Sequence, residues 1–108
     1  MRIRSVLFLG LFLAFAVTAW ASVSGSISGI VRDSSGAVAP NTTVTITNVN
    51  TGVSQKVATN NLGVYSFLAL PVGTYKLVAE AQGFEAYQRT NIILNTNDHL
   101  RFDVVLKV

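Results

Sequence analysis

The stretch "LPVGTYKLVAEAQGF", Leu70–Phe84, orders its residues too regularly for an unstructured loop. Pro71 and Gly73 mark a turn, after which apolar and polar residues alternate between Tyr75 and Glu80. Alternation with a period of two is typical of a β-strand with one buried face. The stretch holds no acid pair, no metal-ligand cluster and no nucleophile beside a base. It therefore predicts a structural element and not a reactive site.

The same alternation recurs along the chain, in short runs separated by Gly, Pro and Asn. In "TTVTITN" the side chains of Val44 and Ile46 are predicted to face inward, with the threonines outward. The weaker run "VSQKVAT" is predicted to turn Val53 and Val57 inward. The clearest run closes the chain, with inward positions at Leu100, Phe102, Val104 and Leu106. About seven such runs without a sustained helical period predict a seven-stranded antiparallel β-sandwich over residues 24–108.

The first 21 residues have the three-part layout of a secretory signal peptide. Arg2 and Arg4 form a basic start, an apolar run follows from Val6 to Val17, and "AWA" is a small-x-small cleavage site. We expect cleavage between Ala21 and Ser22. The alternative is an uncleaved membrane anchor, although the apolar run is short against the roughly 20 residues that span a bilayer.

Removal of residues 1–21 leaves a domain of residues 22–108 with little net charge. The whole chain carries +3, and two of these charges belong to Arg2 and Arg4, so the mature chain carries +1. No basic face remains to bind nucleic acid, and no membrane span is expected in the mature chain. Because the chain has no cysteine, its stability must come from packing and not from disulfides.

Three segments in a fixed order carry a family resemblance: "SGIVRDSSGAVAPNTTVTITN", "NNLGVYSFLALPVGTYKLVAEAQGF" and the closing alternation to Val108. Together they resemble the carboxypeptidase regulatory-like domain, a transthyretin-like Greek-key sandwich. The version most similar to this chain stands at the N-terminus of TonB-dependent outer-membrane receptors. The positions that match the family's spacing are Gly63, Tyr65, Phe67, Leu70, Pro71, Gly73, Tyr75, Gly83 and Phe84.

The resemblance implies structural roles for these positions. Pro71 and Gly73 would turn the chain between two strands, and Gly83 would allow the turn that docks Phe84. Core packing would involve Tyr65, Phe67, Tyr75 and Leu77. One departure precedes Gly63, where "NNL" stands in place of the acidic residue that the family often has. Since asparagine makes the same side-chain-to-backbone bonds, we expect the turn to be retained.

The resemblance does not imply an enzyme. In zinc carboxypeptidases the peptidase activity belongs to a separate large domain with His and Glu ligands. His99 is the only histidine here and cysteine is absent, so the usual zinc ligand set cannot be built. Glu80 and Glu85 are interpreted as solvated charges and His99 as a surface residue. We expect no catalytic residue, no metal and no cofactor.

Two further site types find weak support in the sequence. Asp33 and Asp98 could contribute to a calcium site, but no loop has the dense acidic spacing of a dedicated one. "NTT" from Asn41 matches a glycosylation acceptor, a three-residue pattern that is common by chance.

The function implied by the resemblance is that of a non-catalytic accessory or interaction module in the cell envelope. We expect an exported protein of a bacterium, in the periplasm or associated with the outer membrane. Its partner would be an envelope protein or a receptor barrel, and a sheet edge could accept a strand of that partner. The chain would be either a free periplasmic protein or the opening fragment of a larger receptor.

The alternative is a carbohydrate-binding-like module that takes a glycan or a peptide. Sugar sites favour exposed aromatic side chains, and most aromatic residues of the mature chain occupy inward positions. Tyr87 is the one that we expect to be exposed, and it is therefore the candidate ligand-binding residue.

Overall fold

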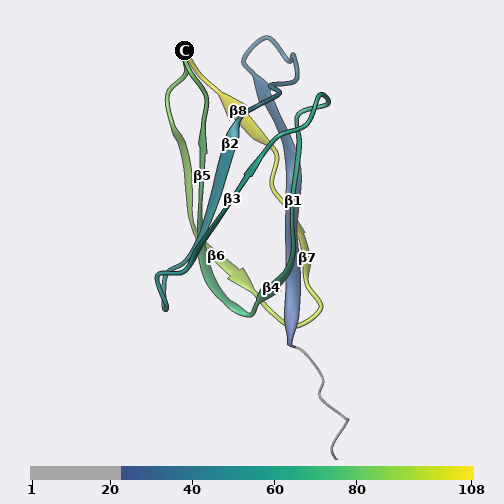
Figure 1. Cartoon of the computed structure of the whole chain (residues 1–108), viewed down its shortest axis with the longest axis vertical. Helices are drawn as coiled ribbons and strands as arrows, with labels where there is room; N and C mark the ends of the chain where they lie inside the picture. Colours follow the sequence, from purple (N-terminus) through teal and green to yellow (C-terminus); the bar gives the residue numbers. More distant parts are fainter. Residues whose placement is uncertain (1–22) are drawn as a thin grey trace, which may run out of the picture.

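A computed structural model describes residues 23–108, which form two four-stranded β-sheets packed face to face (Figure 1). No helix is formed among these residues, and so none that could cross a bilayer. The all-β sandwich predicted from the sequence is confirmed. The predicted signal peptide and its cleavage site at Ala21 and Ser22 lie outside the described residues. The strands are β1 (Ser24–Asp33), β2 (Thr43–Asn48), β3 (Ser54–Ala58), β4 (Val64–Pro71), β5 (Gly73–Glu80), β6 (Tyr87–Leu94), β7 (His99–Arg101) and β8 (Val104–Leu106).

The first sheet is built around β1. β4 pairs antiparallel with one side of β1, whereas β7 and β8 pair parallel with its other side. The second sheet has the strand order β3-β2-β5-β6 and is antiparallel throughout. The parallel pairing differs from the purely antiparallel arrangement expected from the sequence. It arises because β6 ends where β1 begins, so the chain that follows β6 runs in the same direction as β1 (Figure 1).

The closing strand, which the alternation predicts as one run, is broken into β7 and β8 at residues 102 and 103. At the break the N–H of Phe102 donates to the carbonyl of Ser28 at 2.9 Å. The carbonyl of Phe102 turns inward and accepts the hydroxyl proton of Tyr65. A carboxylate oxygen of Asp103 accepts the N–H of Ile30 at 3.0 Å. A side chain thus replaces a backbone acceptor at the point where the ladder is interrupted.

Gly29 makes room for this inward approach. A Cβ atom at this position would lie 1.9 Å from the carbonyl oxygen of Phe102 and 2.9 Å from the hydroxyl of Tyr65. Because the carbonyl oxygen of Phe102 is a backbone atom, no change of side-chain rotamer could relieve this clash. The residue on β1 beneath the break must therefore be glycine.

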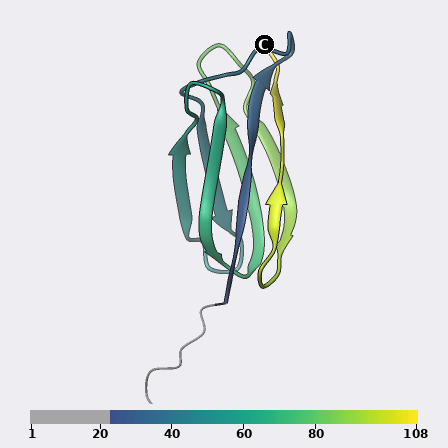
Figure 2. The same cartoon turned by 90° about the vertical axis from the view of Figure 1, so that its right-hand side faces the viewer.

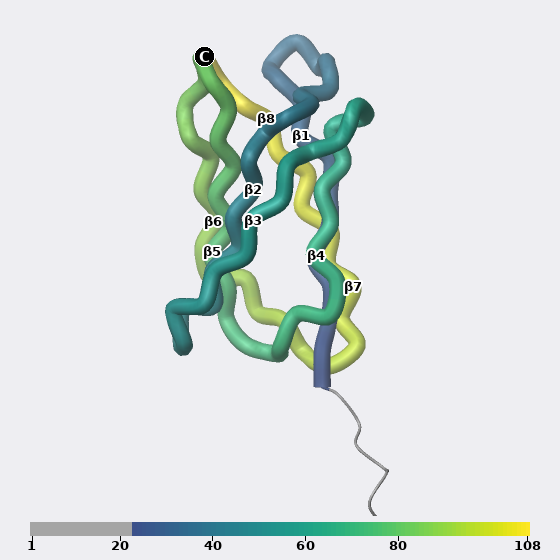
Figure 3. The backbone as a smooth tube through the Cα atoms, viewed as in Figure 1, coloured from purple at the N-terminus to yellow at the C-terminus, as the bar shows by residue number. Residues whose placement is uncertain are grey.

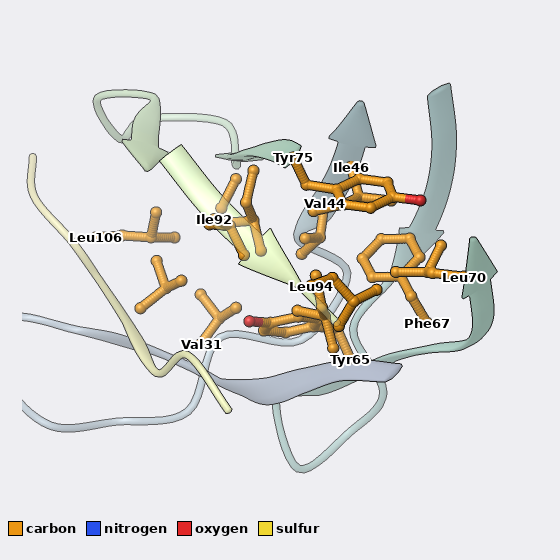
Figure 4. Packing of buried hydrophobic residues seen from close by; sticks show 14 residues of the cluster. Val31, Val44, Ile46, Tyr65, Phe67, Leu70, Tyr75, Ile92, Leu94 and Leu106 are labelled. Atoms are coloured by element: carbon orange, nitrogen blue, oxygen red, sulfur yellow. The ribbon is translucent and has the colours of Figure 1, made fainter. Parts of the chain in front are cut away.

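The core consists of fourteen buried hydrophobic side chains from the inner faces of both sheets. In Figure 4, Val31 and Tyr65 of the first sheet face Val44, Ile46 and Tyr75 of the second. The rings of Tyr65 and Phe67 pack tilted, with centroids 6.0 Å apart. The full set is Ile27, Val31, Val44, Ile46, Tyr65, Phe67, Leu70, Tyr75, Leu77, Ala79, Ile92, Leu94, Val104 and Leu106.

Within Leu70–Phe84, every regular feature of the sequence has a structural role. β4 ends at Pro71 and β5 begins at Gly73. Tyr75 is buried, and its hydroxyl donates to the carbonyl of Pro71 at 2.5 Å. Gly83 has a φ of +85°, and the ring of Phe84 beyond it packs against the core.

The turn before Gly63 forms the bonds expected of asparagine. The side-chain oxygen of Asn60 accepts the N–H groups of Leu62 and Val64, each at 3.0 Å. Gly63 has a φ of +75°, which favours glycine. The turn is therefore stabilised without the acidic residue that the family often uses.

Two residues lie elsewhere than the sequence suggests. Val53, predicted to face inward, is 62% exposed because it lies in the β2–β3 turn at the open edge of the second sheet. Tyr87, which the sequence predicts in the turn before the strand "TNIILN", is the first residue of β6, so this strand begins three residues before Thr90.

Ionisation of Asp103 is coupled to the break between β7 and β8. The N–H of Ile30 holds the pKa of Asp103 below its ordinary value of 3.8, and the hydrogen bond from Arg101 acts in the same direction. A carboxyl whose pKa is lower in the folded than in the unfolded chain stabilises the fold when it is ionised.

We expect this contribution to disappear in acid. It is present at a pH above the unfolded-chain value near 3.8 and is lost as the pH falls through the lower value of the folded protein. Asp103→Asn keeps an acceptor for Ile30 but removes the titrating group. Its free energy of unfolding, measured by urea denaturation, should fall less below pH 3.8 than that of the wild type. Identical falls in the two proteins would contradict the assignment.

Adjacent residues of β5 should differ sharply in their effect on stability. Tyr75→Ala leaves a cavity in the core, and loss of such a large aromatic side chain costs about 3–5 kcal/mol. Lys76→Ala changes only the outer face, where substitutions stay within about 0.5 kcal/mol. Thermal unfolding of both variants measures the difference. If Tyr75→Ala kept full stability but lost a binding activity, this segment would be a recognition surface and not a core strand.

Candidate ligand-binding cleft

A cleft of about 400 Å³ lies between the start of β6 and β8. These strands belong to different sheets but run along the same side of the sandwich (Figure 2). The cleft thus stands where the edges of the two sheets meet. Its lining residues are Glu85, Ala86, Tyr87, Gln88, Asp103, Val105 and Lys107.

Tyr87 is the aromatic side chain of this cleft. It is the first residue of β6 and pairs with Ala79 of β5, so the antiparallel ladder holds its backbone. Its side chain, which the sequence predicts to be exposed, is half-buried because it packs against the edge of the core. One part of the ring is therefore fixed by packing while the rest lines the cleft. Such an arrangement offers a ligand a rigid aromatic surface.

Two contacts hold the walls of the cleft together. The N–H of Glu85 donates to the carbonyl of Lys107 at 2.7 Å and links the segment before β6 to the segment after β8. Further along, the guanidinium of Arg89 on β6 lies over the ring of Phe102, 4.3 Å from its centroid. A cation above an aromatic face is attracted by the ring quadrupole. Both contacts join the two sheets on this side.

The polar groups of the cleft are suited to hydrogen bonding. Glu85, Asp103 and Lys107 are exposed, as is the amide of Gln88. Asp103 is an anion at neutral pH, since the Ile30 N–H lowers its pKa further below the ordinary value of 3.8, and it also accepts a bond from Arg101 Nε at 3.2 Å. An ionised carboxylate accepts hydrogen bonds and does not deliver a proton as a general acid. The arrangement can therefore bind polar ligands.

The phenol of Tyr65 lies beneath the cleft and does not open into it. Burial raises the pKa of this hydroxyl, and the negative charge of Asp103 raises it further. The hydroxyl consequently stays protonated and remains the donor to the Phe102 carbonyl. Its role is to fix the wall of the cleft.

The other residues considered as sites lie apart from one another. His99 is exposed on β7 and forms a hydrogen bond between Nδ1 and the hydroxyl of Ser26 at 2.7 Å. Glu80 ends β5 on the solvent side, and only Glu85 borders the cleft. Within residues 23–108, no three side chains of the metal-ligating types His, Cys, Asp or Glu gather at one point.

Asp33 and Asp98, the candidates for a calcium site, are used in separate turns. Asp33 Oδ1 accepts the N–H groups of Ser35 and Ala37 at 2.9 Å and 3.2 Å, and its bond with the Ser35 hydroxyl is the first cause of its lowered pKa. Asp98 Oδ2 accepts the N–H of Asn95 at 2.8 Å. Each carboxylate thus stabilises its own local turn.

Sequence reasoning named Tyr87 as a candidate ligand residue and did not name the residues that line the cleft with it. Asp103, Val105 and Lys107 follow Tyr87 by sixteen or more residues and come from the other sheet. Their alternation shows only that they face outward. No spacing in the sequence indicates that they meet the start of β6.

Similar folds occur in proteins of different kinds. A candidate carbohydrate-binding protein of Bacteroides uniformis has a TM-score of 0.61 and 17% identity, over 78% of this chain and 41% of its own. The dioxygenase domain of a dioxygenase–carbohydrate-binding protein fusion from Streptomyces sp. SirexAA-E has a TM-score of 0.63 and 12% identity, over 85% and 84%. A type II cohesin–X–dockerin complex of Acetivibrio cellulolyticus contains a chain with a TM-score of 0.59 and 13% identity, over 76% and 56%.

At these identities the likeness concerns the fold alone. The chain spans less than two thirds of the Bacteroides and Acetivibrio proteins. No curated protein sequence matches it. The family comparison is more specific, because the model of the carboxypeptidase regulatory-like domain matches residues 26–107, which include all eight strands except the first two residues of β1. The chain therefore belongs to the carboxypeptidase regulatory-like domain family.

Proposed function

We propose that this protein is a non-catalytic interaction module of the bacterial cell envelope. The observation that supports this proposal is that the polar side chains form hydrogen bonds that stabilise the fold. Asp33 and Asp103 bond to backbone N–H groups at two separate places, while the adjacent residues Asp98 and His99 bond to the Asn95 N–H and to the Ser26 hydroxyl. Groups held in this way stabilise turns and sheet junctions. Ser26 and His99 meet at 2.7 Å, but the Asp98 carboxylate bonds to Asn95 and not to the imidazole, so no acid, base and nucleophile are aligned among the described residues.

Membership of the regulatory-like family supports the same function. The resemblance to the N-terminal extension of TonB-dependent receptors, together with the predicted signal peptide, supports a location in the periplasm or at the outer membrane.

The test uses the absence of cysteine from the natural chain. Single cysteines at the exposed positions Ser34, Ser66 and Gln88 accept a photo-crosslinker on three different elements. In the native host, the mature protein should begin at Ser22, fractionate with the envelope and crosslink to an outer-membrane protein that mass spectrometry identifies.

A variant without residues 2–21 is the matched control, and it should remain in the cytoplasm without an adduct. Retention of the full chain in the cytoplasm would overturn the proposed location. An envelope protein that gives no adduct from any of the three positions would overturn the proposed interaction.

Carbohydrate binding in the cleft is a second candidate function, and the position of Tyr87 favours it. A half-buried ring beside an amide and exposed charged groups matches the chemistry of a sugar site, in which an apolar face is stacked and hydroxyls are hydrogen-bonded. The likeness to the Bacteroides protein agrees with a binding module of this kind. The two functions are compatible, since an envelope module can hold a glycan.

We expect Tyr87→Ala to weaken glycan binding, because it removes the stacking surface, and Tyr87→Phe to keep most of it. Isothermal titration with cello-, xylo- and chito-oligosaccharides measures the affinity. Thr90→Ala, an exposed substitution on the same strand outside the cleft lining, is the matched control. Melting curves show whether each variant is folded. If none of these sugars binds at millimolar concentration, the carbohydrate hypothesis is wrong.

A further inference from the structure

The outer edge of β3 carries backbone groups that point away from the sheet. The N–H of Asn48 donates to the carbonyl of Val53, and the N–H of Thr59 donates to the carbonyl of Thr42, both at 2.9 Å. These two bonds identify the odd-numbered residues of the β3 segment as the ones bonded to β2. In an antiparallel ladder the intervening residues direct their N–H and C=O groups to the opposite side. Those residues are Ser54, Lys56 and Ala58, and in the described structure β3 has β2 as its one neighbour within the sheet.

β3 is also the most regular of the outer strands. All five of its residues pair with β2 without a register shift, and none of them has a positive φ. Figure 3 shows β3 running along β2 on the outside of the second sheet. A straight edge with unpaired backbone groups is a template for pairing with another strand.

The other outer strands are interrupted. β4 contains Ala69 with a φ of 55°, beside a register shift in its pairing with β1. β6 contains Asn91 with a φ of 57°, beside a register shift in its pairing with β5. β7 and β8 have three residues each. Bulges bend a strand and disrupt its ladder, so these edges are protected in a way that β3 is not.

A small apolar cleft adjoins the start of β3. It has a volume of about 190 Å³, and most of its surface is apolar. Its lining residues are Ile46, Val53, Pro71 and Tyr75 together with the polar Asn48, Thr51 and Gln55. The exposed fraction of Val53, 62%, is large for a valine beside a core. A strand added along β3 would place one side chain over this cleft on its inner face, because alternate residues of a strand point to the same side. The chemistry of the cleft favours an apolar residue there.

Lys56 at the centre of β3 argues against pairing between two copies of this chain. The antiparallel register that uses all the outward groups of Ser54, Lys56 and Ala58 sets Lys56 opposite Lys56 of a second copy. Like charges directly opposite one another are destabilising, whereas opposite charges stabilise the pair. Shifting the register to separate the lysines leaves Ala58 or Ser54 unpaired. The same lysine attracts an acidic residue on a different strand.

We propose that β3 accepts an extended segment of a partner protein as a fifth strand of the β3-β2-β5-β6 sheet. The segment carries Asp or Glu opposite Lys56 and β-branched residues on either side, one of which covers the cleft at Val53. Pairing of this kind obtains its affinity from main-chain hydrogen bonds and its specificity from alternate side chains. The inference rests on the proposed interaction function and names the surface and the chemistry of the partner.

The experiment uses purified protein and two capped synthetic peptides, Thr-Val-Thr-Glu-Val-Thr-Val and the same sequence with Lys in place of Glu. We expect the Glu peptide to bind roughly tenfold more tightly at low salt, the effect of exchanging a favourable cross-strand pair for a repulsive one. The difference should shrink as salt screens the exposed charges. Hydrogen exchange followed by NMR should slow at the amides of Ser54, Lys56 and Ala58.

Substitutions at Lys56 test whether the peptide pairs with the edge of β3. Lys56→Pro removes an outward N–H that is not bonded to β2, and it should abolish peptide binding while the fold is kept. Lys56→Glu, which should fold even if the proline variant does not, is expected to reverse the preference between the two peptides. Lys76→Ala on β5 is the matched control, because it removes a lysine from the same outer face within an interior strand and should leave binding unchanged.

Three results would overturn the inference: no binding of either peptide at millimolar concentration, an unchanged preference in Lys56→Glu, or exchange protection on β4 or β6 in place of β3. A concentration-dependent dimer that excludes the peptide would identify a second copy as the occupant and would also overturn it. Because this assay uses purified protein, its outcome is independent of the location and crosslinking experiment. Either proposal can fail while the other holds.

Discussion

The structure depends on how the end of the chain packs against its first strand. β1 is paired with β4 on one side and with β7 and β8 on the other, so the first sheet forms only when the last strands have arrived. At the centre of this junction the carbonyl of Phe102 occupies the space above Gly29 and accepts the hydroxyl of Tyr65. Tyr65 on β4, Gly29 on β1 and the Phe102 carbonyl at the break between β7 and β8 therefore fix one another. The contact has a high sequence separation, and closing such a loop is entropically costly before its contacts form.

This junction makes the two sides of the sandwich different. On one side, the bond between Glu85 and Lys107 and the packing of Arg89 on Phe102 join β6 to the closing strands. These two contacts hold together a cleft that has charged and aromatic walls. On the other side, β3 and β4 are outer strands of their sheets, and the backbone of β3 remains available. A small domain without disulfides thus leaves one flank suited to a small polar ligand and the other to an extended chain.

The sequence predicted the fold class well, because alternation within a strand is a local property. The alternating positions from Tyr75 to Ala79 and from Val104 to Leu106 are buried, since successive side chains of a strand point to opposite faces. The break at Phe102 and Asp103 could not be predicted in this way. The alternation runs through it unchanged, and the groups that stabilise the break lie on β1 and β4, far away in the sequence. Val53 was wrongly predicted to be inward because a pattern of apolar residues does not show where a sheet ends.

By itself, the sequence determined that this chain is a cysteine-free β-protein with the family's signature turns, and it marked Tyr87 as a candidate ligand residue. These properties depend on residues close together in the chain, where turn chemistry and side-chain period act directly. Tertiary structure alone decided that Tyr87 meets Asp103 and Lys107, that the last strands run parallel to the first, and that β3 keeps a straight open edge. Those features depend on which strands become neighbours. Strand neighbours are established only when the buried faces of the two sheets pack together.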